Sequence, residues 1–216
     1  MEDTDLRLLE LIAARMCHDL VGPVGAAVNG AELLAEGEAA DVEVVRLIGQ
    51  SARQASRRLQ VFRVIYGTPG ALSGAAPFAQ AGQLLGAMLE GEKAALDWRV
   101  DPAVEAGVGR VGARLVLLLA LACVEALPRG GQVRVSGTVV GGRATLEAAA
   151  IGQGAKFADE ASAAFVGRTP PAQLTPKVAP CELACRLARA AGGGIDVGQG
   201  AEGPILRAIL PASSSV

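Results

Sequence analysis

The chain contains a single histidine, His18, so any chemistry that needs an imidazole must pass through this residue. Near neutral pH one ring nitrogen is unprotonated, which allows the side chain to act as a nucleophile or a proton carrier. Its neighbours along the chain are Cys17 and Asp19. Successive residues of a helix point about 100° apart, so Cys17 is a poor partner for the imidazole. A thiol protease is therefore not expected.

The cysteines and the lone histidine also argue against a metal site. A zinc site would have to be built from cysteines or carboxylates, and the pair Cys181 and Cys185 has no matching second pair. The four cysteines are scattered among apolar, helix-like neighbours, as reduced core cysteines usually are. We expect no metal and no disulfide in this chain.

His18 belongs to the first of two long segments with helical periodicity. Residues 4–36 and 41–66 show apolar spacing without strand-like alternation, and the segment between them, 37–40, is short. This pattern predicts a helical hairpin. A stretch rich in glycine, alanine, proline and serine follows at 67–77. We therefore expect a hairpin domain over residues 1–70 and a second domain over residues 71–216.

The hairpin carries an apolar stripe on each helix and places His18 away from it. The stripes comprise Leu9, Ile12, Met16, Leu20, Pro23, Ala27, Gly30 and Leu34 on the first helix, and Ile48, Ala52, Ala55, Leu59, Phe62 and Tyr66 on the second. Two helices alone bury too little surface for a core, which predicts that two copies pair into a four-helix bundle. The protein is thus expected to be a homodimer.

Counting about 100° per residue, His18 lies opposite Leu9 and faces water or a partner. Gly22, Gly25 and Asn29 follow the same outward line, although each glycine costs about 1 kcal/mol of helix propensity relative to alanine. We call these three residues the glycine face. It offers a shallow depression where the backbone of another protein can approach. Alternatively, the glycines are small because the second domain or a neighbouring helix packs on them.

The second domain alternates between helix-like and strand-like segments. Helices are predicted at 78–89, 113–126, 158–166 and 181–191, and strands at 94–100, 132–139, 143–149, 194–198 and 205–210. The turn Val140-Gly-Gly142 joins two adjacent strands. This order predicts an α/β sandwich with helices on one face of a mixed sheet, which makes the whole chain α+β.

Composition excludes several classes of partner. The 20 basic and 22 acidic residues give a net charge of −2, which argues against nucleic acid and anionic lipid. The longest dense apolar run, 115–124, covers about half of the roughly 20 residues that a membrane span needs. The acidic start of the chain does not resemble a signal peptide. We expect a cytoplasmic protein.

The run His18-Asp-Leu-Val-Gly-Pro23 resembles the H-box of histidine kinases. The longer run, from Cys17 to Leu34, is similar to the histidine phosphotransferases of the ChpT type. This resemblance implies that His18 relays a phosphoryl group between receiver-domain aspartates and that Asp19 orients the ring or raises its basicity; alternatively, Asp19 is a solvated helix carboxylate. The donor would be the receiver of a hybrid histidine kinase, and the acceptors would be response-regulator receivers of the CtrA type. The expected docking residues are Val21, Gly22, Gly25 and Asn29. By the symmetry of the hairpin the second helix passes His18 near residue 58, so Arg53, Arg57 and Arg58 are candidate neighbours of the phosphoryl group or, alternatively, exposed helix charges.

The same resemblance implies that the second domain has lost ATP. Leu118 and Ala122 stand where a kinase has its metal-binding asparagines, and Ala150 stands where its adenine-reading aspartate belongs. The segment 174–180, where a glycine-rich loop is expected, contains no glycine. We therefore expect no cofactor here, with Mg²⁺ supplied by the partner receiver. Two alternatives stay open: a histidine kinase with a divergent nucleotide pocket, and a scaffold that only binds receivers.

Overall fold

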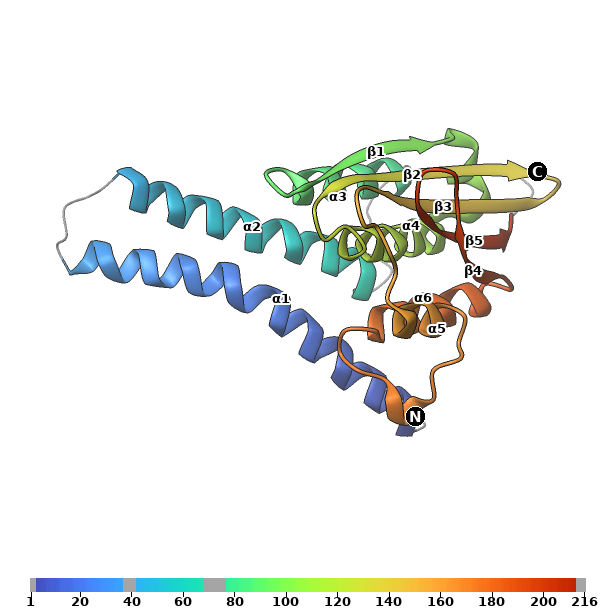
Figure 1. The fold of residues 1–216 in the computed structure, drawn as a ribbon, viewed down its shortest axis with the longest axis horizontal. Helices are drawn as coiled ribbons and strands as arrows, with labels where there is room; N and C mark the ends of the chain where they lie inside the picture. Colours follow the sequence, from blue (N-terminus) through green and yellow to red (C-terminus); the bar gives the residue numbers. More distant parts are fainter. Residues whose placement is uncertain (1–2, 37–41, 68–76, 213–216) are drawn as a thin grey trace.

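The computed structural model describes residues 3–36, 42–67 and 77–212 of the chain, which folds into a long helical hairpin and a helix-covered sheet (Figure 1). The predicted turn at 37–40 lies outside the described residues, as do most of the predicted linker and the boundary at residue 70. The elements before and after these gaps match the predicted hairpin and the α+β class. The hairpin stands out from one end of the sheet domain.

The hairpin consists of α1 (Asp3–Ala35) and α2 (Val42–Tyr66), which pack along each other. Gly30 permits the close approach, because a Cβ atom there would lie 2.7 Å from Cγ1 of Ile48. Three positions of the predicted stripes are exposed in the single chain, namely Leu9 (55%), Ala52 and Leu59 (48%), and at the start of α1 Leu8 is buried instead of Leu9. Leu8 packs with Ala179 of the sheet domain, which displaces the buried face at the start of α1.

The sheet domain contains α3 (Pro77–Leu89), β1 (Ala94–Val100), α4 (Pro102–Glu125), β2 (Gly131–Val140) and β3 (Arg143–Ile151). It continues with α5 (Asp159–Phe165), the 3-10 turn η2 (Pro171–Gln173), α6 (Ala179–Ala190), β4 (Gly194–Gln199) and β5 (Pro204–Pro211). The strand order is β1-β2-β3-β5-β4, with β1 and β2 parallel and the other pairs antiparallel. Gly141 and Gly142 both have positive φ, as a two-residue hairpin turn requires. The predicted mixed sheet is confirmed.

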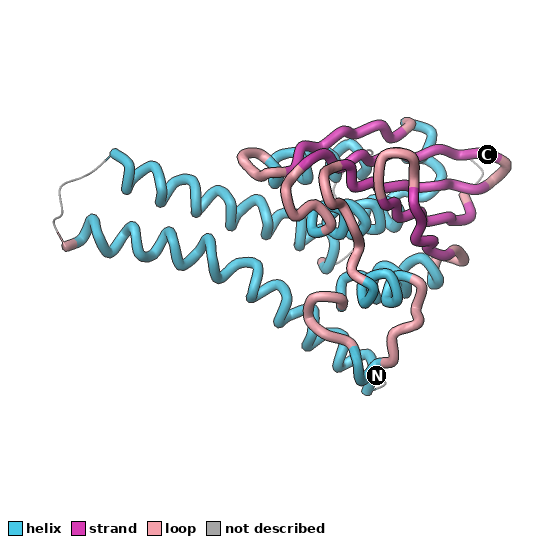
Figure 2. Tube along the Cα trace, in the orientation of Figure 1, coloured by secondary structure: helices cyan, strands magenta, loops and turns pink. Residues whose placement is uncertain are grey.

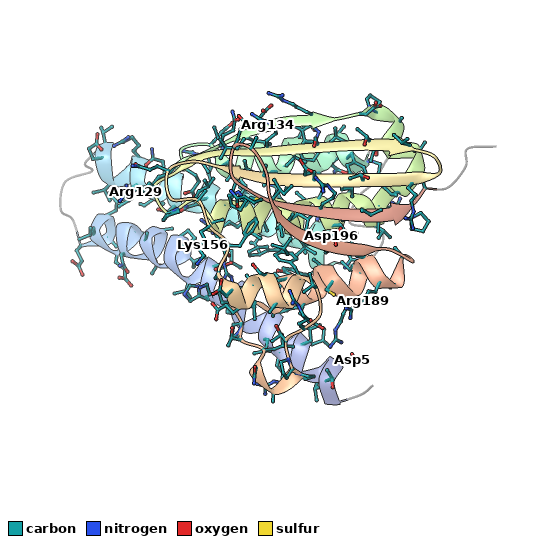
Figure 3. The ribbon with its side chains drawn as sticks, turned by 45° about the vertical axis from the view of Figure 1, so that its right-hand side comes forward. Asp5, Arg129, Arg134, Lys156, Arg189 and Asp196 are labelled. Atoms are coloured by element: carbon teal, nitrogen blue, oxygen red, sulfur yellow. The ribbon has the colours of Figure 1, made fainter. Side chains whose placement is uncertain are left out.

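The helices cover one face of this sheet (Figure 2). Side chains that alternate along the strands point into the core, among them Val133, Val135, Leu206 and Leu210. The opposite face carries ion pairs, such as the one between Arg207 and Glu147 and the one between Asp97 and Arg134, which is labelled in Figure 3. This one-sided packing is the predicted sandwich.

Helix α4 is longer than the predicted helix over 113–126. It begins at Pro102, with the Asp101 side chain accepting a hydrogen bond from the Ala103 N–H group at 2.8 Å. Gly109 interrupts the helical conformation with φ +46°. The three glycines of residues 107–112 weaken the helical pattern in the sequence, and the predicted helix corresponds to the part of α4 that follows the kink at Gly109.

The hairpin and the sheet domain share a core. Val61, Val64 and Ile65 of α2 are buried in the same cluster as Phe78 and Leu115. At the other side, α1 contacts α6, and Asp5, labelled in Figure 3, pairs with Arg186 at 2.8 Å. The end of α2 and the start of α1 are thus both fixed to the sheet domain.

Cys123, Cys181 and Cys185 are buried as expected for core cysteines, whereas Cys17 is exposed. Helices α1 and α4 are both long and apolar enough to span a bilayer by length and composition alone. For α4, the core helix of the sheet domain, 56% of the apolar window is buried, whereas 6% of the α1 window is buried in the single chain.

Candidate functional site

The site begins with His18 on the outer side of α1. Its side chain is 84% exposed, as the helical count predicted, whereas that of Asp19 is only 13% exposed. An exposed ring on a helix is accessible from solvent without any movement of the chain. The next residue, by contrast, is held against the protein.

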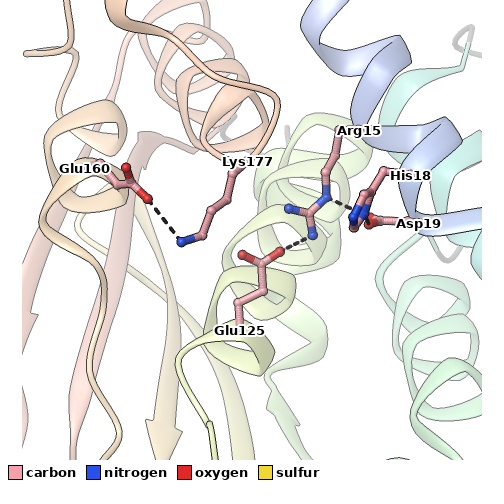
Figure 4. A network of polar contacts seen from close by, with 6 residues as sticks. All are labelled: Arg15, His18, Asp19, Glu125, Glu160 and Lys177. Carbon is pink, nitrogen blue, oxygen red and sulfur yellow. Dashed lines mark hydrogen bonds and ion pairs between the residues drawn. The ribbon is translucent and has the colours of Figure 1, made fainter.

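Asp19 connects the ring to the structure behind it (Figure 4). Its Oδ1 atom lies 3.2 Å from Nδ1 of His18, and its Oδ2 atom accepts a hydrogen bond from Nε of Arg15 at 2.8 Å. An ionised carboxylate only accepts hydrogen bonds, so a hydrogen bond across this distance requires the proton to be on Nδ1 of the ring. The remaining nitrogen, Nε2, then has a free lone pair. This arrangement presents a nucleophile to solvent.

Arg15 extends the contacts to the second domain. Its terminal amino group forms an ion pair with Glu125, the last residue of α4. Nearby, Lys177 pairs with Glu160 at 3.1 Å (Figure 4). Glu125, Arg15, Asp19 and His18 therefore form a continuous set of contacts, which we call the polar chain.

Charge and burial act in opposite directions along the polar chain. Burial disfavours the charged form of Arg15, but the carboxylates of Glu125 and Asp19 outweigh it and raise its pKa. Burial raises the pKa of Glu125 too, although the attraction of Arg15 opposes this shift. The raised pKa favours the charged form of Arg15 but the neutral form of Glu125. The charged form prevails at Arg15 because it has two carboxylate partners, whereas Glu125 has mainly one cation. Arg15 is the firmly charged centre of the set.

Two aromatic side chains of α2 lie beside the buried residues of the polar chain. The rings of Phe62 and Tyr66 lie 5.8 Å apart, and both line a small cavity of about 30 Å³ beside Arg15 and Asp19. Burial raises the pKa of Tyr66, so its phenol stays neutral. An apolar wall strengthens the electrostatic contacts that it shields from water.

The glycine face is open in this chain. Among the described residues, no heavy atom outside the local helix backbone would lie within 4 Å of a Cβ atom added at Gly22 or Gly25. Asn29 is exposed, and the nearby Val21 is 70% exposed. Packing of the second domain on these glycines, the alternative raised by the sequence, is therefore not what the structure shows.

The predicted arginine neighbours of His18 are engaged elsewhere. Arg57 forms an ion pair with Glu90, and Arg58 forms one with Glu92 at 3.3 Å. Both glutamates belong to the turn after α3, because the face of α2 that carries these arginines points to the sheet domain. Arg53 lines a groove between α2 and that same turn. The expectation that the helix-two arginines meet the ring at His18 receives no support from these contacts.

The positions that correspond to a kinase nucleotide site are apolar or filled. Leu118 is 2% exposed and Ala150 is fully buried. Ala122 lines a cavity of only about 90 Å³, well below the roughly 300 Å³ of small ligand sites. Among residues 3–36, 42–67 and 77–212, no group of three or more histidine, cysteine, aspartate or glutamate side chains is arranged to hold a metal.

Sequence reasoning missed two members of the polar chain. Arg15 precedes Asp19 by four residues, which is the spacing of a helical ion pair and could have been noticed. Glu125 follows Arg15 by 110 positions. No local pattern in the sequence indicates that these two residues meet.

Known proteins resemble this chain in sequence and in fold. The family described as histidine phosphotransferase C-terminal domain matches residues 78–203. Protein phosphotransferase ChpT of Brucella abortus (strain 2308) is 35% identical over 130 residues, which is 60% of this chain and 60% of that protein. The alignment thus spans less than two thirds of that relative.

Two solved structures extend the likeness to the hairpin. A bacterial phosphotransferase is 27% identical with a TM-score of 0.78, covering 96% of this chain and 97% of that one. The Acinetobacter baumannii histidine kinase AdeS shares the fold alone, at 12% identity and a TM-score of 0.50 over 91% of this chain and 98% of the kinase chain. With a family match over more than half of its length and this outward histidine on a kinase-like fold, the chain belongs to the histidine phosphotransferase family.

Proposed function

We propose that this protein relays phosphoryl groups between receiver-domain aspartates, with His18 as the carrier. The observation that supports this most directly is the exposed ring, whose Nδ1 faces Asp19 and whose Nε2 is free. Nε2 attacks the phosphorus of an aspartyl phosphate, the N–P bond forms, and the P–O bond to the receiver's carboxylate breaks. The reverse step passes the group to a second receiver. In-line transfer requires a close approach, which an exposed helix face allows.

The donor in this proposal is the receiver of a hybrid histidine kinase, and the acceptors are response-regulator receivers of the CtrA type. The acidic pocket of the receiver supplies the Mg²⁺ that offsets the charge of the equatorial oxygens. No part of the relay needs ATP, and the protein works in the cytoplasm. Asp19 holds the ring and stabilises the positive charge of the phosphorylated imidazole.

The function is tested by mixing the protein with receivers that carry radioactive phosphate. We expect the label to move to His18 and to be acid-labile and base-stable, as a phosphohistidine is. A panel of receivers also shows which ones act as donors and which as acceptors. A protein that binds receivers without taking up label would be a scaffold.

We expect no nucleotide binding, which separates the relay from the histidine kinase alternative. Titration with Mg-ATP should give no saturable heat, with any Kd above about 1 mM. The reason is that Leu118, Ala122 and Ala150 offer no polar atoms to the metal or the adenine, and a site without its hydrogen-bonding groups binds weakly. Micromolar affinity together with self-labelling of His18 would overturn this choice.

The relay is also proposed to act as a homodimer, and Leu59→Asp should separate the two copies. Leu59 is 48% exposed in the single chain, and Ala52 beside it is exposed as well, so α2 has an apolar face that a second hairpin can cover. An unpaired charge buried at that seam opposes association. Analytical ultracentrifugation should show monomers that keep their helical content. A stable dimer of this variant would mean that the seam lies elsewhere.

A further inference from the structure

The polar chain crosses from the sheet domain to the hairpin at one point next to His18. Glu125 ends α4, and its carboxylate binds the Arg15 guanidinium on α1. The guanidinium is a planar fork with five N–H donors, so it can hold two carboxylates at fixed relative positions. Here it holds Glu125 through its terminal nitrogen and Asp19 through Nε.

Burial is greatest at Asp19 and lowest at the ring. Along the polar chain, the side chain of Glu125 is 44% exposed, those of Arg15 and Asp19 are 20% and 13% exposed, and that of His18 is 84% exposed. An exposed imidazole has no packing to fix its orientation or its tautomer. Within residues 3–36, 42–67 and 77–212, its one side-chain hydrogen-bonding contact is with Oδ1 of Asp19, at 3.2 Å. The tautomer therefore depends on how firmly that carboxylate is held.

Arg15 determines which oxygen of Asp19 is available to the ring. Because Arg15 occupies Oδ2, the carboxylate cannot turn away, and Oδ1 stays directed at Nδ1. Glu125 in turn holds the far end of the long Arg15 side chain, which would otherwise have several rotamers. A hydrogen bond at one ring nitrogen sets the protonation of the other.

We infer that Arg15 and Glu125 are positioning residues for phosphotransfer, through which the sheet domain holds His18 as its Nδ1–H tautomer with Nε2 free. This inference rests on the proposed function. In the step itself, neutral His18 attacks the aspartyl phosphate through Nε2 and becomes an imidazolium that keeps its Nδ1 proton. The aspartate leaves as a carboxylate, and the net charge is conserved. Asp19, held by Arg15, accepts from that proton throughout.

The experiment uses the single histidine of the chain. In untagged protein labelled with ¹⁵N-histidine, NMR reports the protonation of each nitrogen of His18 alone. We expect the Nδ1–H form to dominate in the wild type and the Nε2–H form to increase in Arg15→Gln and Glu125→Gln. Phosphorylation of His18 by phosphoramidate, a small donor that needs no docking, should slow by about tenfold in both variants.

Asp5→Asn is the matched control for Glu125→Gln. It also converts a carboxylate to an amide and breaks an ion pair between α1 and the sheet domain, here with Arg186, but it lies outside the polar chain. We expect its tautomer and its phosphoramidate rate to equal those of the wild type. A purely structural role for Glu125 would make the two variants behave alike, which would overturn the inference.

Two further results would also overturn the inference: an Nε2–H form in the wild type, or tautomer and rate unchanged in both polar-chain variants. Failure of the proposed function would be seen differently, as a wild type that takes no label from any phosphorylated receiver. The NMR and phosphoramidate measurements involve no receiver, so the two failures can be told apart.

Discussion

Replacing His18 by glutamine should abolish phosphotransfer, with a loss of about a thousandfold or more. Glutamine keeps a polar side chain of similar reach but has no nucleophilic nitrogen. The chain has no second histidine that can take over. Because the ring is 84% exposed and fills no core volume, the free energy of unfolding should change by no more than about 0.5 kcal/mol. Label transfer from a phosphorylated receiver measures the first effect, and thermal unfolding measures the second.

Asp19→Asn serves as the graded comparison for this variant. It leaves the nucleophile in place but loses the charge that binds Arg15 and the ring, so it should slow transfer without abolishing it. A His18→Gln protein that still accepts label would show that another residue carries the phosphoryl group. A drop of several degrees in its melting temperature would indicate a structural histidine.

Gly25→Arg should block receiver docking while the hairpin stays folded. The site is open, since a Cβ atom at Gly25 would meet no described heavy atom within 4 Å outside the local helix backbone. Arginine is also a better helix former than glycine by about 0.8 kcal/mol. A bulky side chain on the line from His18 to Asn29 should keep the receiver from the ring. We expect affinity for a receiver to fall tenfold or more, which is about 1.4 kcal/mol, with a normal melting curve.

Gly30→Arg is the control, because Gly30 is packed against α2 whereas Gly25 is open. A Cβ atom there would lie 2.7 Å from Cγ1 of Ile48, so this substitution should separate α1 from α2 and lower the melting temperature. Unchanged receiver affinity and transfer in a well-folded Gly25→Arg protein would contradict docking on the glycine face. The identity of the phosphorylated histidine would be unaffected by that result.

Local patterns in the sequence predicted most of the elements and the orientation of His18. Strand β1 was predicted with its observed bounds, and the two hairpin helices differ from prediction by only one residue at their described ends. These features depend on short-range rules, namely helical periodicity, strand alternation and the Gly-Gly turn. The outward direction of His18 follows from the same helical count.

Contacts between distant segments could not be predicted in this way. The position of Arg57 was inferred from the symmetry of the hairpin, but α2 packs against the sheet domain and turns that arginine to Glu90. Leu8 replaces Leu9 as the buried residue because Ala179 packs there. The meeting of Arg15 and Glu125 likewise depends on how two domains pack, which no window of sequence contains.

The core that the C-terminal end of α2 shares with the sheet domain has a consequence for local unfolding. Val61 and Ile65 are fully buried, whereas Val42, Val45 and Leu47 near the other end are all more than 40% exposed. Amide hydrogens at the C-terminal end of α2 should therefore exchange only when the sheet domain opens. Those near the start of α2 should exchange through fraying of the helix. A single helix then spans two cooperative units. His18, the proposed phosphoacceptor, lies on the neighbouring helix α1, whose start is anchored to α6 at Leu8 and Asp5, so it is carried by a helix that is held at its N-terminal end.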